Sequence, residues 1–488
     1  MRFTLTIIAV LLTACTFSQS GIVWGPEISV SDGTTYGNLR PRATIIGNDT
    51  PVVIYGRAGD GNLYTSRWNG SSFDTPVTLL PLSLSAYIAN WTGPDIASQG
   101  DTIVAVFKLN PLETGNVYSV RSVDGGLTFT DTIRVDNHDT GVAWMPSMDM
   151  DANGDPVVTY MAHDASWSNP RYVIANSSDA GVTYNPETEV TSAITGEACD
   201  CCPAEMVIEG QKQVMLFRNN DMNTRDIFGV LSTDGGATYP STDNIDNLSW
   251  NVNSCPATGP HGIFNSDNLL MAYASAASGK YRVYVSSSTT VGALTFDNRV
   301  MMVEPDPANG TQNYPRISGI GDTVVMAWSE TTSGNQNIYT SLSLSLTGAD
   351  HLTNLSSSKI MANTSTIGAQ TVPEIIYKNG FVHLFYQDNE SGDLIYRRGT
   401  IEDVTGIESI PNEDFSVYPN PSLNGVFNLP PSTEVIGVTD ALGNHVSFEI
   451  QTIDGALEIK INHSSKGMYF LSYLYGDAVQ KVATLLVD

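Results

Sequence analysis

The segment "SVDGGLTF" (122–129) returns as "SSDAGVTY" (177–184) and again as "STDGGATY" (232–239). Each copy has the pattern Ser-x-Asp-x-Gly-x-Thr-aromatic. This pattern predicts a turn in which the Asp carboxylate accepts bonds from turn amides, the Gly adopts a positive φ, and the aromatic ring packs inward. Because three copies keep one register, we expect them at equivalent places of a repeated fold. The residues expected to build the turns are Ser122, Asp124, Gly126, Phe129, Ser177, Asp179, Gly181, Tyr184, Ser232, Asp234, Gly236 and Tyr239.

Seven prolines, each leading into a short apolar run, extend this repeat along the chain. They lie 52 to 58 residues apart, at Pro41, Pro94, Pro146, Pro203, Pro260, Pro315 and Pro373. A second, more apolar run follows each one, as in "PVVIYGR" (51–57) and "TVVMAWSE" (323–330), and a third strand follows in most repeats. Short strands in a fixed order at this period predict an all-β fold, a six- or seven-bladed β-propeller over 21–399, with seven blades favoured. Residues 21–30 are expected to add a strand to the last blade and close the ring.

The three turn segments resemble the Asp box, the repeat of bacterial neuraminidases. The resemblance implies a sialidase-like propeller. Asp boxes lie on the side of a propeller away from its active site and occur in many propellers that cleave nothing, so the resemblance implies the fold more strongly than the activity.

Candidate ligand-binding residues follow from the repeat, because a propeller binds ligands at one end of its central channel. That end is built from loops that lead into the first strand and out of the second strand of each blade. Cations at these positions favour an anionic group such as a carboxylate, and solvated loop charges are the alternative interpretation. The ligand-binding candidates are Arg42, Arg57, Lys108, Arg218 and Arg316.

The resemblance to sialidases also implies an arginine triad, a Tyr–Glu nucleophile pair and an Asp acid. The catalytic candidates are Tyr314 with Tyr55 as its alternative, Glu330 with Glu374, and Asp388 with Asp164. The Arg-Ile-Pro motif of sialidases is absent, and "NLRPRAT" (38–44) is only a distant echo of it. Two functions therefore stay open: a propeller that binds and hydrolyses acidic glycans, or a non-catalytic adhesin or scaffold that binds protein or polysaccharide. No cofactor and no metal are expected.

Three cysteines crowd into "GEACDCCPAEM" (196–206), and a fourth stands in "WNVNSCP" (250–256). Four cysteines in an exported chain favour disulfides. We expect Cys255 to bond to Cys199, Cys201 or Cys202 and to tie two neighbouring blades together. The alternative is a thiolate metal site completed by a histidine, although Cys-x-Cys-Cys has no standard zinc spacing.

The two ends of the chain predict export. Residues 1–20 have the charged start and short apolar run of a signal peptide, with "LTAC" (12–15) as an alternative lipobox. Residues 415–488, with "YPNP" (418–421) and "GMYF" (467–470), resemble the C-terminal sorting domain of the type IX secretion system, after an acidic linker at 400–414. The resemblance implies an Ig-like β-sandwich, the secretion machinery as partner, and an extracellular or outer-surface location.

Charge composition narrows the partners further. The chain has 51 acidic and 23 basic residues, a formal net charge of −28. Such a chain repels nucleic acid and anionic membranes. No segment beyond the signal peptide is long and apolar enough to be a transmembrane segment.

Overall fold

The computed structural model describes residues 19–31, 37–57, 59–252, 257–303, 310–332, 334–345, 347–357, 359–404, 417–430, 433–441, 444–453, 456–462, 465–474 and 480–487. The chain divides into two compact units, Met1–Asp403 and Val404–Asp488. Strands make up nearly all the regular structure of the described residues. The exceptions are the 3-10 turn η1 (Ala165–Trp167) and the helix α1 (Gly348–Ser357).

Among its described residues the first unit contains seven sheets, in which most strands pair with the strand that precedes or follows them in the chain. Six of the sheets follow in chain order. The first sheet holds β3 (Asn38–Ile46), β4 (Thr50–Arg57), β5 (Leu63–Arg67) and β6 (Val77–Thr78), and the second holds β7 (Asp95–Gln99), β8 (Thr102–Lys108), β9 (Val117–Ser122) and β10 (Ile133–Arg134). The third sheet holds β11 (Val142–Met150), β12 (Pro156–Asp164), β13 (Ser168–Asn176) and β14 (Thr188–Glu189), and the fourth holds β16 (Glu205–Glu209), β17 (Lys212–Asn220), β18 (Ile227–Ser232) and β19 (Ser241–Asn244), with β15 (Glu197–Ala198) also paired to β17. The fifth sheet holds β20 (His261–Asn265), β21 (Asn268–Ser275), β22 (Arg282–Thr289) and β23 (Thr295–Met302), and the sixth holds β24 (Thr311–Ile320), β25 (Thr323–Thr332), β26 (Asn335–Leu344) and β27 (Ile360–Met361).

The seventh sheet joins the two ends of the unit. It holds β28 (Gln370–Lys378), β29 (Phe381–Asp388) and β30 (Asp393–Val404), and the N-terminal β1 (Gln19–Trp24) and β2 (Ile28–Ser29) both pair with β30. The expected addition of residues 21–30 to the last sheet is thus observed. The strand β30 also continues to Val404, into the stretch 400–414 that was predicted as linker, because Thr400 still pairs with Phe381 of β29. Residues 405–416 lie outside the described part of the chain.

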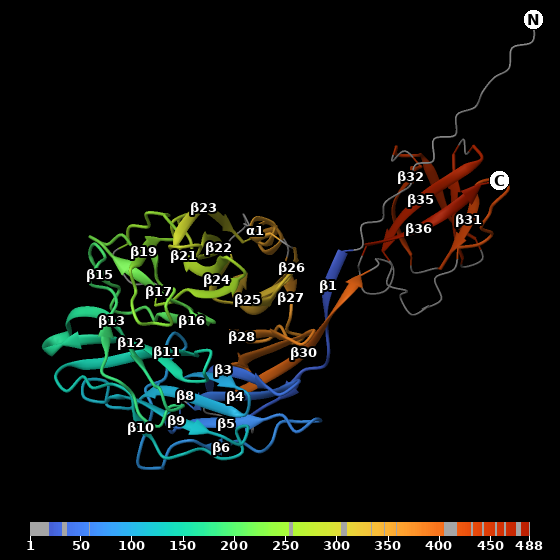
Figure 1. Cartoon of the computed structure of the whole chain (residues 1–488). Helices are drawn as coiled ribbons and strands as arrows, with labels where there is room; N and C mark the ends of the chain where they lie inside the picture. Colours follow the sequence, from blue (N-terminus) through green and yellow to red (C-terminus); the bar gives the residue numbers. More distant parts are fainter. Residues whose placement is uncertain are drawn as a thin grey trace, which may run out of the picture. The chain divides into compact units, whose positions relative to one another are not determined.

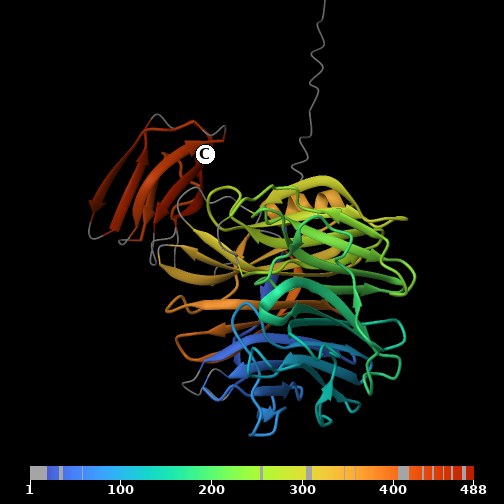
Figure 2. The same ribbon diagram turned by 90° about the vertical axis from the view of Figure 1, so that its left-hand side faces the viewer.

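The seven first strands pack against one another in a closed cycle, from β3 through β7, β11, β16, β20, β24 and β28 back to β3. In Figure 1 the first strands β3, β11, β16, β24 and β28 lie near the middle of this unit, and the last strands β6, β10, β19 and β23 lie at its periphery. The perpendicular view in Figure 2 shows the sheets layered from the blue N-terminal strands to the yellow ones. This arrangement of sheets around a central axis is a β-propeller.

The apolar second strands explain why the sheets stack. In β4 the run from Val52 to Tyr55 is completely buried, and Phe107 of β8 is equally inaccessible. Ile54 and Phe107 share one core cluster, so the core lies between adjacent sheets. The cores are therefore a series of interfaces between sheets.

The three Asp-containing segments form the same turn. In the first, Asp124 Oδ1 accepts bonds from Ser122 Oγ at 2.7 Å and from the Thr128 amide at 2.9 Å, and Asp124 Oδ2 accepts from Thr128 Oγ1 at 2.6 Å. Gly126 has φ +85° and donates its amide to Ser122 Oγ at 2.8 Å. The bonds of Asp179 and Asp234 repeat this set.

The aromatic residue of each turn packs inward. Phe129 contacts a core cluster of the first unit. The hydroxyl of Tyr184 donates to Ser119 Oγ at 3.0 Å, and that of Tyr239 to Gln213 Oε1 at 2.5 Å. These rings fasten the turns to the strands beneath them.

The second unit has two three-stranded sheets around one core. One sheet has the order β31 (Val426–Leu429), β34 (Ala456–Ile461), β33 (Phe448–Ile453), and the other has β32 (Glu434–Asp440), β35 (Gly467–Leu474), β36 (Gln480–Val487). Phe427 and Ile459 of the first sheet share a buried cluster with Val438 and Leu471 of the second. Within the described residues of the whole chain, no helix has the length and hydrophobicity needed to cross a bilayer.

Candidate functional site

The residue after each repeat proline lies at the central channel and enters a shared polar network. In six repeats it follows the proline directly, and in the fourth repeat it comes one position later. Because each proline stands at the same place in its repeat, one sequence position is copied seven times around the axis. These residues are Arg42, Asp95, Ser147, Glu205, His261, Arg316 and Glu374.

Backbone bulges aim several of these side chains into the channel. The pairing of first and second strands shifts register next to the proline in four sheets. The residue before the proline has a positive φ in each: 49° at Arg40, 50° at Met145, 53° at Tyr314 and 50° at Val372. Non-glycine residues rarely adopt this conformation, and such strain clusters at functional sites. The same device thus recurs around one end of the channel.

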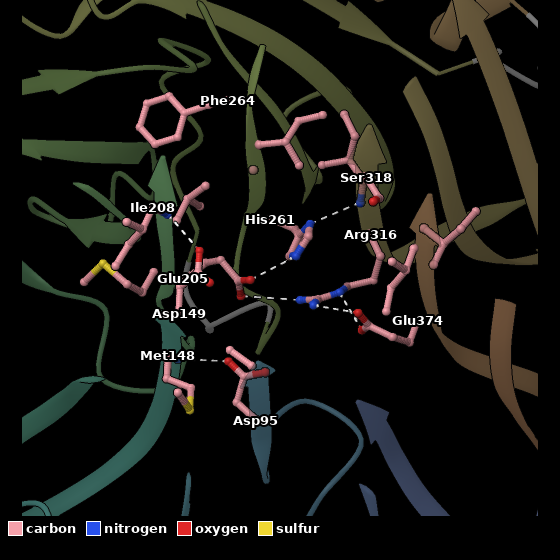
Figure 3. A pocket seen from close by; sticks show the side chains of 18 of the residues that line it. Asp95, Met148, Asp149, Glu205, Ile208, His261, Phe264, Arg316, Ser318 and Glu374 are labelled. Atoms are coloured by element: carbon pink, nitrogen blue, oxygen red, sulfur yellow. Dashed lines mark hydrogen bonds and ion pairs between the residues drawn. The ribbon is translucent and has the colours of Figure 1, made fainter. Parts of the chain in front are cut away.

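Two arginines of the network, Arg316 and Arg42, are held by carboxylates, and Figure 3 shows Arg316. Arg316 Nη2 donates to Glu374 Oε1 at 3.1 Å, Arg316 Nε lies 2.8 Å from Glu374 Oε2 as an ion pair, and Nη1 lies 3.4 Å from Glu205 Oε2. Arg42 Nη1 lies 3.1 Å from Glu374 Oε2. The attraction between the charges of such buried ion pairs offsets part of the cost of removing them from water. The structure therefore brings the ligand-binding candidates Arg42 and Arg316 together, with their charges already paired to carboxylates.

His261 continues the network on the other side of Glu205. Its Nδ1 accepts a bond from the Ile317 amide at 3.1 Å, so the ring proton is on Nε2, which donates to Glu205 Oε1 at 2.9 Å. Burial alone would raise the pKa of Glu205, but His261, Arg316 and Arg42 outweigh it and hold that pKa at about 2. Glu205 is thus a buried carboxylate that stays ionised.

A cavity of about 330 Å³ continues along the channel beyond the network. Asp95 accepts bonds from Ser147 Oγ at 2.8 Å and the Met148 amide at 3.0 Å. Asp149 accepts the Ile208 amide at 2.9 Å, and burial raises the pKa of its carboxyl to about 7. The wall of the cavity therefore has two carboxyl groups whose pKa values are shifted in opposite directions. Glu205 stays ionised, and Asp149 becomes protonated near neutral pH.

On the other side of the network a small pocket of about 30 Å³ forms the mouth of the channel. We call it the mouth pocket. It contains the aromatic rings, cations and prolines that the bulges bring together. Its lining includes Arg40, Arg42, Trp91, Pro203, Glu205, Thr258, Pro260, Tyr314, Pro315, Arg316, Val372 and Pro373.

Arg40 is the unusual member of the mouth pocket. Its side chain is only 7 % exposed, yet no described residue forms a hydrogen bond or ion pair with its guanidinium, and Nε is buried without a partner. A Cβ at position 93 would lie 2.9 Å from Arg40 Cδ, so Gly93 leaves the space that this side chain fills. Burial and the charge of Arg42 lower the pKa of Arg40 well below its usual value, against the attraction of Asp95. The pocket therefore holds a largely buried cation that has no ion-pair partner among the described residues.

The other predicted cations bond within their surroundings and do not converge. Arg57 donates to Tyr64 Oη at 3.0 Å and lies over the Tyr64 ring. Lys108 donates to the Gly115 carbonyl, and burial lowers its pKa to about 8. Arg218 is fully buried and donates to backbone carbonyls, including that of Ala274 at 2.7 Å. All three lie at the same repeat position, at the end of the second strand, and there they stabilise neighbouring segments through these contacts.

The catalytic candidates are also separated. Tyr314 lines the mouth pocket, and no carboxylate among the described residues bonds to its hydroxyl. Glu330 is buried and accepts bonds from Gln312 Nε2 at 2.9 Å and Lys359 Nζ at 2.8 Å. Asp388 closes the turn after β29, where Ser391 Oγ donates to it at 2.9 Å. The structure therefore does not place Glu330 or Asp388 with Tyr314.

Of the alternatives, Tyr55 is fully buried in a core cluster. Glu374 is held by the two arginines described above. Asp164 lies on an exposed loop and bonds to Arg171 Nη1 at 2.9 Å. Among the described contacts, none of these three residues takes part in a pair between a tyrosine hydroxyl and a carboxylate at the mouth pocket.

The cysteine cluster is buried beside two arginines. Cys199 Sγ lies 3.3 Å from Cys202 Sγ and 4.0 Å from Cys201 Sγ, and Arg225 Nη1 lies 3.0 Å from it. The bond from Cys202 and the arginine charges lower the pKa of Cys199 to about 7. Cys199 and Cys202 are thiols. Cys255 lies outside the described residues, so the predicted tie between neighbouring blades stays a prediction.

The repeat alignment contained the signal for residues that sequence reasoning missed. Asp95 and Ser147 follow their prolines exactly as Arg42 does, and Glu205 follows one residue later. Because these three side chains carry no positive charge, a criterion that selects cations for an anionic ligand does not select them. Considered together, the residues that follow the seven repeat prolines predict a ring of both acidic and basic side chains.

Comparison with known proteins identifies one part of the chain. Residues 416–487 match the family described as "Secretion system C-terminal sorting domain". No curated protein matches the chain.

Similar solved structures cover between 78 % and 95 % of this chain. A protein of unknown function from Dyadobacter fermentans is 13 % identical over 78 % of this chain and 100 % of its own, with a TM-score of 0.45. The GH93 α-L-arabinofuranosidase of Fusarium graminearum is 9 % identical over 78 % and 98 %, with a TM-score of 0.41. The Trypanosoma rangeli sialidase is 11 % identical over 95 % and 88 %, with a TM-score of 0.44. The C-terminal unit is a type IX secretion system sorting domain, which marks the chain for export.

Proposed function

We propose that the first unit binds an acidic glycan group through the mouth pocket without hydrolysing it, and that the sorting domain delivers this binding unit to the cell surface or the medium. The observation that carries the proposal is Arg40, a largely buried arginine at the mouth of the channel to which no described residue supplies an ion-pair partner. A carboxylate on a sugar ring has the charge and the planar pair of acceptors that a guanidinium binds best.

The neighbours of Arg40 explain why a ligand is the expected partner. Arg42 and Arg316 already bond to Glu374, so the carboxylates of the network are engaged. Burying a charge without a partner costs free energy, and proteins retain such groups mainly where function requires them. An incoming carboxylate would relieve that cost, whereas a second cation would add to it.

Binding is favoured over hydrolysis by the surroundings of Tyr314. A tyrosine nucleophile requires a carboxylate base within hydrogen-bond reach. Within the described part of the chain, no carboxylate bonds to the Tyr314 hydroxyl, and burial raises the pKa of Tyr314. A neutral phenol is a poor nucleophile and a good hydrogen-bond donor to a sugar carboxylate or hydroxyl.

The architecture assigned to this function has seven blades, one for each sheet of the first unit, followed by an Ig-like sandwich in the second. Seven equivalent prolines and a closed cycle of seven first strands support that count. Two three-stranded sheets around one core support the sandwich. The partner of the second unit is the type IX secretion machinery.

The test is calorimetric titration of the first unit, residues 19–404, with sialic, glucuronic and galacturonic acids and with neutral hexoses as controls. Arg40→Gln is expected to weaken binding of the acidic sugars by about 10- to 100-fold, the loss of one charge-assisted hydrogen bond. Arg299→Gln removes one exposed positive charge from strand β23 and should leave affinity unchanged. Equal losses in both variants, or no wild-type binding of any acidic sugar, would refute the proposal. Release of sugar from chromogenic glycosides would refute its non-hydrolytic part.

A further inference from the structure

We infer that an aromatic ridge beside the mouth pocket is a second sugar subsite, which holds neutral rings of the same glycan by stacking on Trp167. The inference deepens the proposed function and rests on it for the position of the acidic group. The ridge consists of Tyr87, Trp91, Trp144, His163 and Trp167.

The ridge is a continuous set of rings. Trp91, which lines the mouth pocket, lies 5.7 Å from Trp144 between ring centroids, and Trp144 lies 5.3 Å from Trp167. Both contacts are edge-to-face, with interplanar angles of 87° and 81°. Trp144 Nε1 donates to His163 Nε2 at 3.2 Å, which fixes the middle ring. Three indoles thus lead outward from the channel mouth.

Trp167 stands at the outer end of the ridge and is 37 % exposed. Its loop carries three positive φ angles on non-glycine residues, 65° at Ser166, 59° at Trp167 and 53° at Asn169. Asp164 holds the far side of the loop, accepting bonds from Asn169 Nδ2 at 3.1 Å and Arg171 Nη1 at 2.9 Å. A strained loop that is firmly anchored presents an exposed indole in one orientation, which is how a binding surface is preorganised.

A second pocket opens beside this indole. It has a volume of about 600 Å³, within the range of roughly 300–1,000 Å³ typical of small-ligand sites. Its wall combines Trp167 with hydrogen-bonding groups from Glu113, Asn116, Arg134 and Asp139. An aromatic face next to fixed donors and acceptors matches a sugar ring, which has an apolar C–H face and a rim of hydroxyls.

Two glycines allow the loops around this pocket to approach each other. A Cβ at position 115 would lie 1.8 Å from the Leu109 carbonyl oxygen, and a Cβ at position 141 would lie 2.0 Å from that of His163. Gly115 and Gly141 both line the pocket, and Gly141 has φ +120°. The pocket depends on a close backbone approach that other residues would prevent.

The occupant that fits both pockets is an oligosaccharide with an acidic residue at Arg40 and neutral rings along the ridge. A small isolated anion would contact only the mouth pocket. A neutral disaccharide would contact only the outer one. The ridge joins the two, because Trp91 belongs to one pocket and Trp167 to the other.

The experiment compares glucuronic acid with a tetrasaccharide that carries one terminal glucuronate on three neutral hexoses, titrated into residues 19–404. The wild type is expected to bind the tetrasaccharide about 10-fold more tightly than the monosaccharide, from one stacked ring. Trp167→Ala should abolish that gain and leave the monosaccharide constant unchanged, and Trp167→Phe should restore part of it. Tyr281→Ala, a partly exposed aromatic on the loop before β22, is the matched control.

The outcomes separate the two proposals. Loss of monosaccharide binding only in Arg40→Gln, with loss of the chain-length gain only in Trp167→Ala, supports both. If the acidic sugar fails to bind but a neutral tetrahexose binds and Trp167→Ala abolishes this binding, the subsite stands and the role of Arg40 fails. An unchanged chain-length gain in Trp167→Ala, or no wild-type binding of any oligosaccharide, overturns the subsite.

Discussion

Arg316 and Glu374 form a two-point ion pair across neighbouring sheets, with Nε 2.8 Å from Oε2 and Nη2 3.1 Å from Oε1. They follow equivalent prolines of successive repeats, so the pair joins β24 to β28 at the channel. The same guanidinium reaches Glu205 on β16. One side chain thereby connects three first strands.

We therefore predict that Arg316→Ala lowers the free energy of unfolding by about 1.5–3 kcal/mol. The loss is limited because Glu374 keeps Arg42 and Glu205 keeps His261 as a partner. Urea denaturation of residues 19–404 at pH 7 measures it. A variant that also carries Glu374→Gln removes one of those charges and should regain part of the loss. A single-variant loss below about 1 kcal/mol would show that the network is solvated and not a structural joint.

The three Asp turns predict loss of stability in acid. Hydrogen bonds lower the pKa of Asp124, Asp179 and Asp234 to about 2, from an ordinary value near 3.8. Because the folded pKa lies below the unfolded one, the stabilisation is complete above about pH 4 and disappears as the pH falls through 2. Urea midpoints measured from pH 5 to pH 2 should fall, and the triple Asp→Asn variant should show a shallower fall. An identical slope in wild type and variant would contradict this account.

For the cysteines we predict one disulfide between Cys201 and Cys255 in the exported protein, with thiols at Cys199 and Cys202. Closing a loop of this length stabilises the folded chain by about 4 kcal/mol, as an upper figure. Non-reducing peptide mapping by mass spectrometry, with metal analysis of the same sample, checks the pairing. Four thiols with a stoichiometric metal would establish the metal site instead, against which the charge of Arg225 at 3.0 Å from Cys199 argues.

Deletion of residues 415–488 is predicted to retain the protein in the periplasm, because it removes the sorting domain. The propeller should still fold, since the sorting domain has its own core. Fractionation of the host and immunoblotting locate the product, and a protease-resistance assay reports its folding. Undiminished amounts outside the cell would mean that export uses another signal.

The fold was largely predictable because its signals are local and repeated. The Ser–Asp–Gly pattern around Asp124 specifies a turn by itself, and the seven prolines place one first strand each. For the site, the sequence predicts which repeat positions face the channel, but it does not predict which of their side chains bond to one another. Arg316 was nominated as a ligand-binding residue, but its bond to Glu205, 111 residues away, depends on the strand order around the axis. Arg40 gains its importance from the bulge at its position and from the lack of an ion-pair partner among the described residues, neither of which a single sequence reveals.

The seventh sheet has a consequence for biogenesis. Strand β2 pairs with β30, with Ile28 opposite Tyr396. The last sheet therefore contains strands from both ends of the first unit, and we call this pairing the latch. A ribosome must have produced nearly the whole unit before this latch can close, and contacts of such long range form slowly. The sorting domain comes next in the chain, after the latch strand β30. Only a polypeptide that already contains every blade therefore carries the sorting domain. Prematurely terminated products have the predicted signal peptide but not the sorting domain, so the order of the parts itself acts as a proofreading step for passage beyond the periplasm.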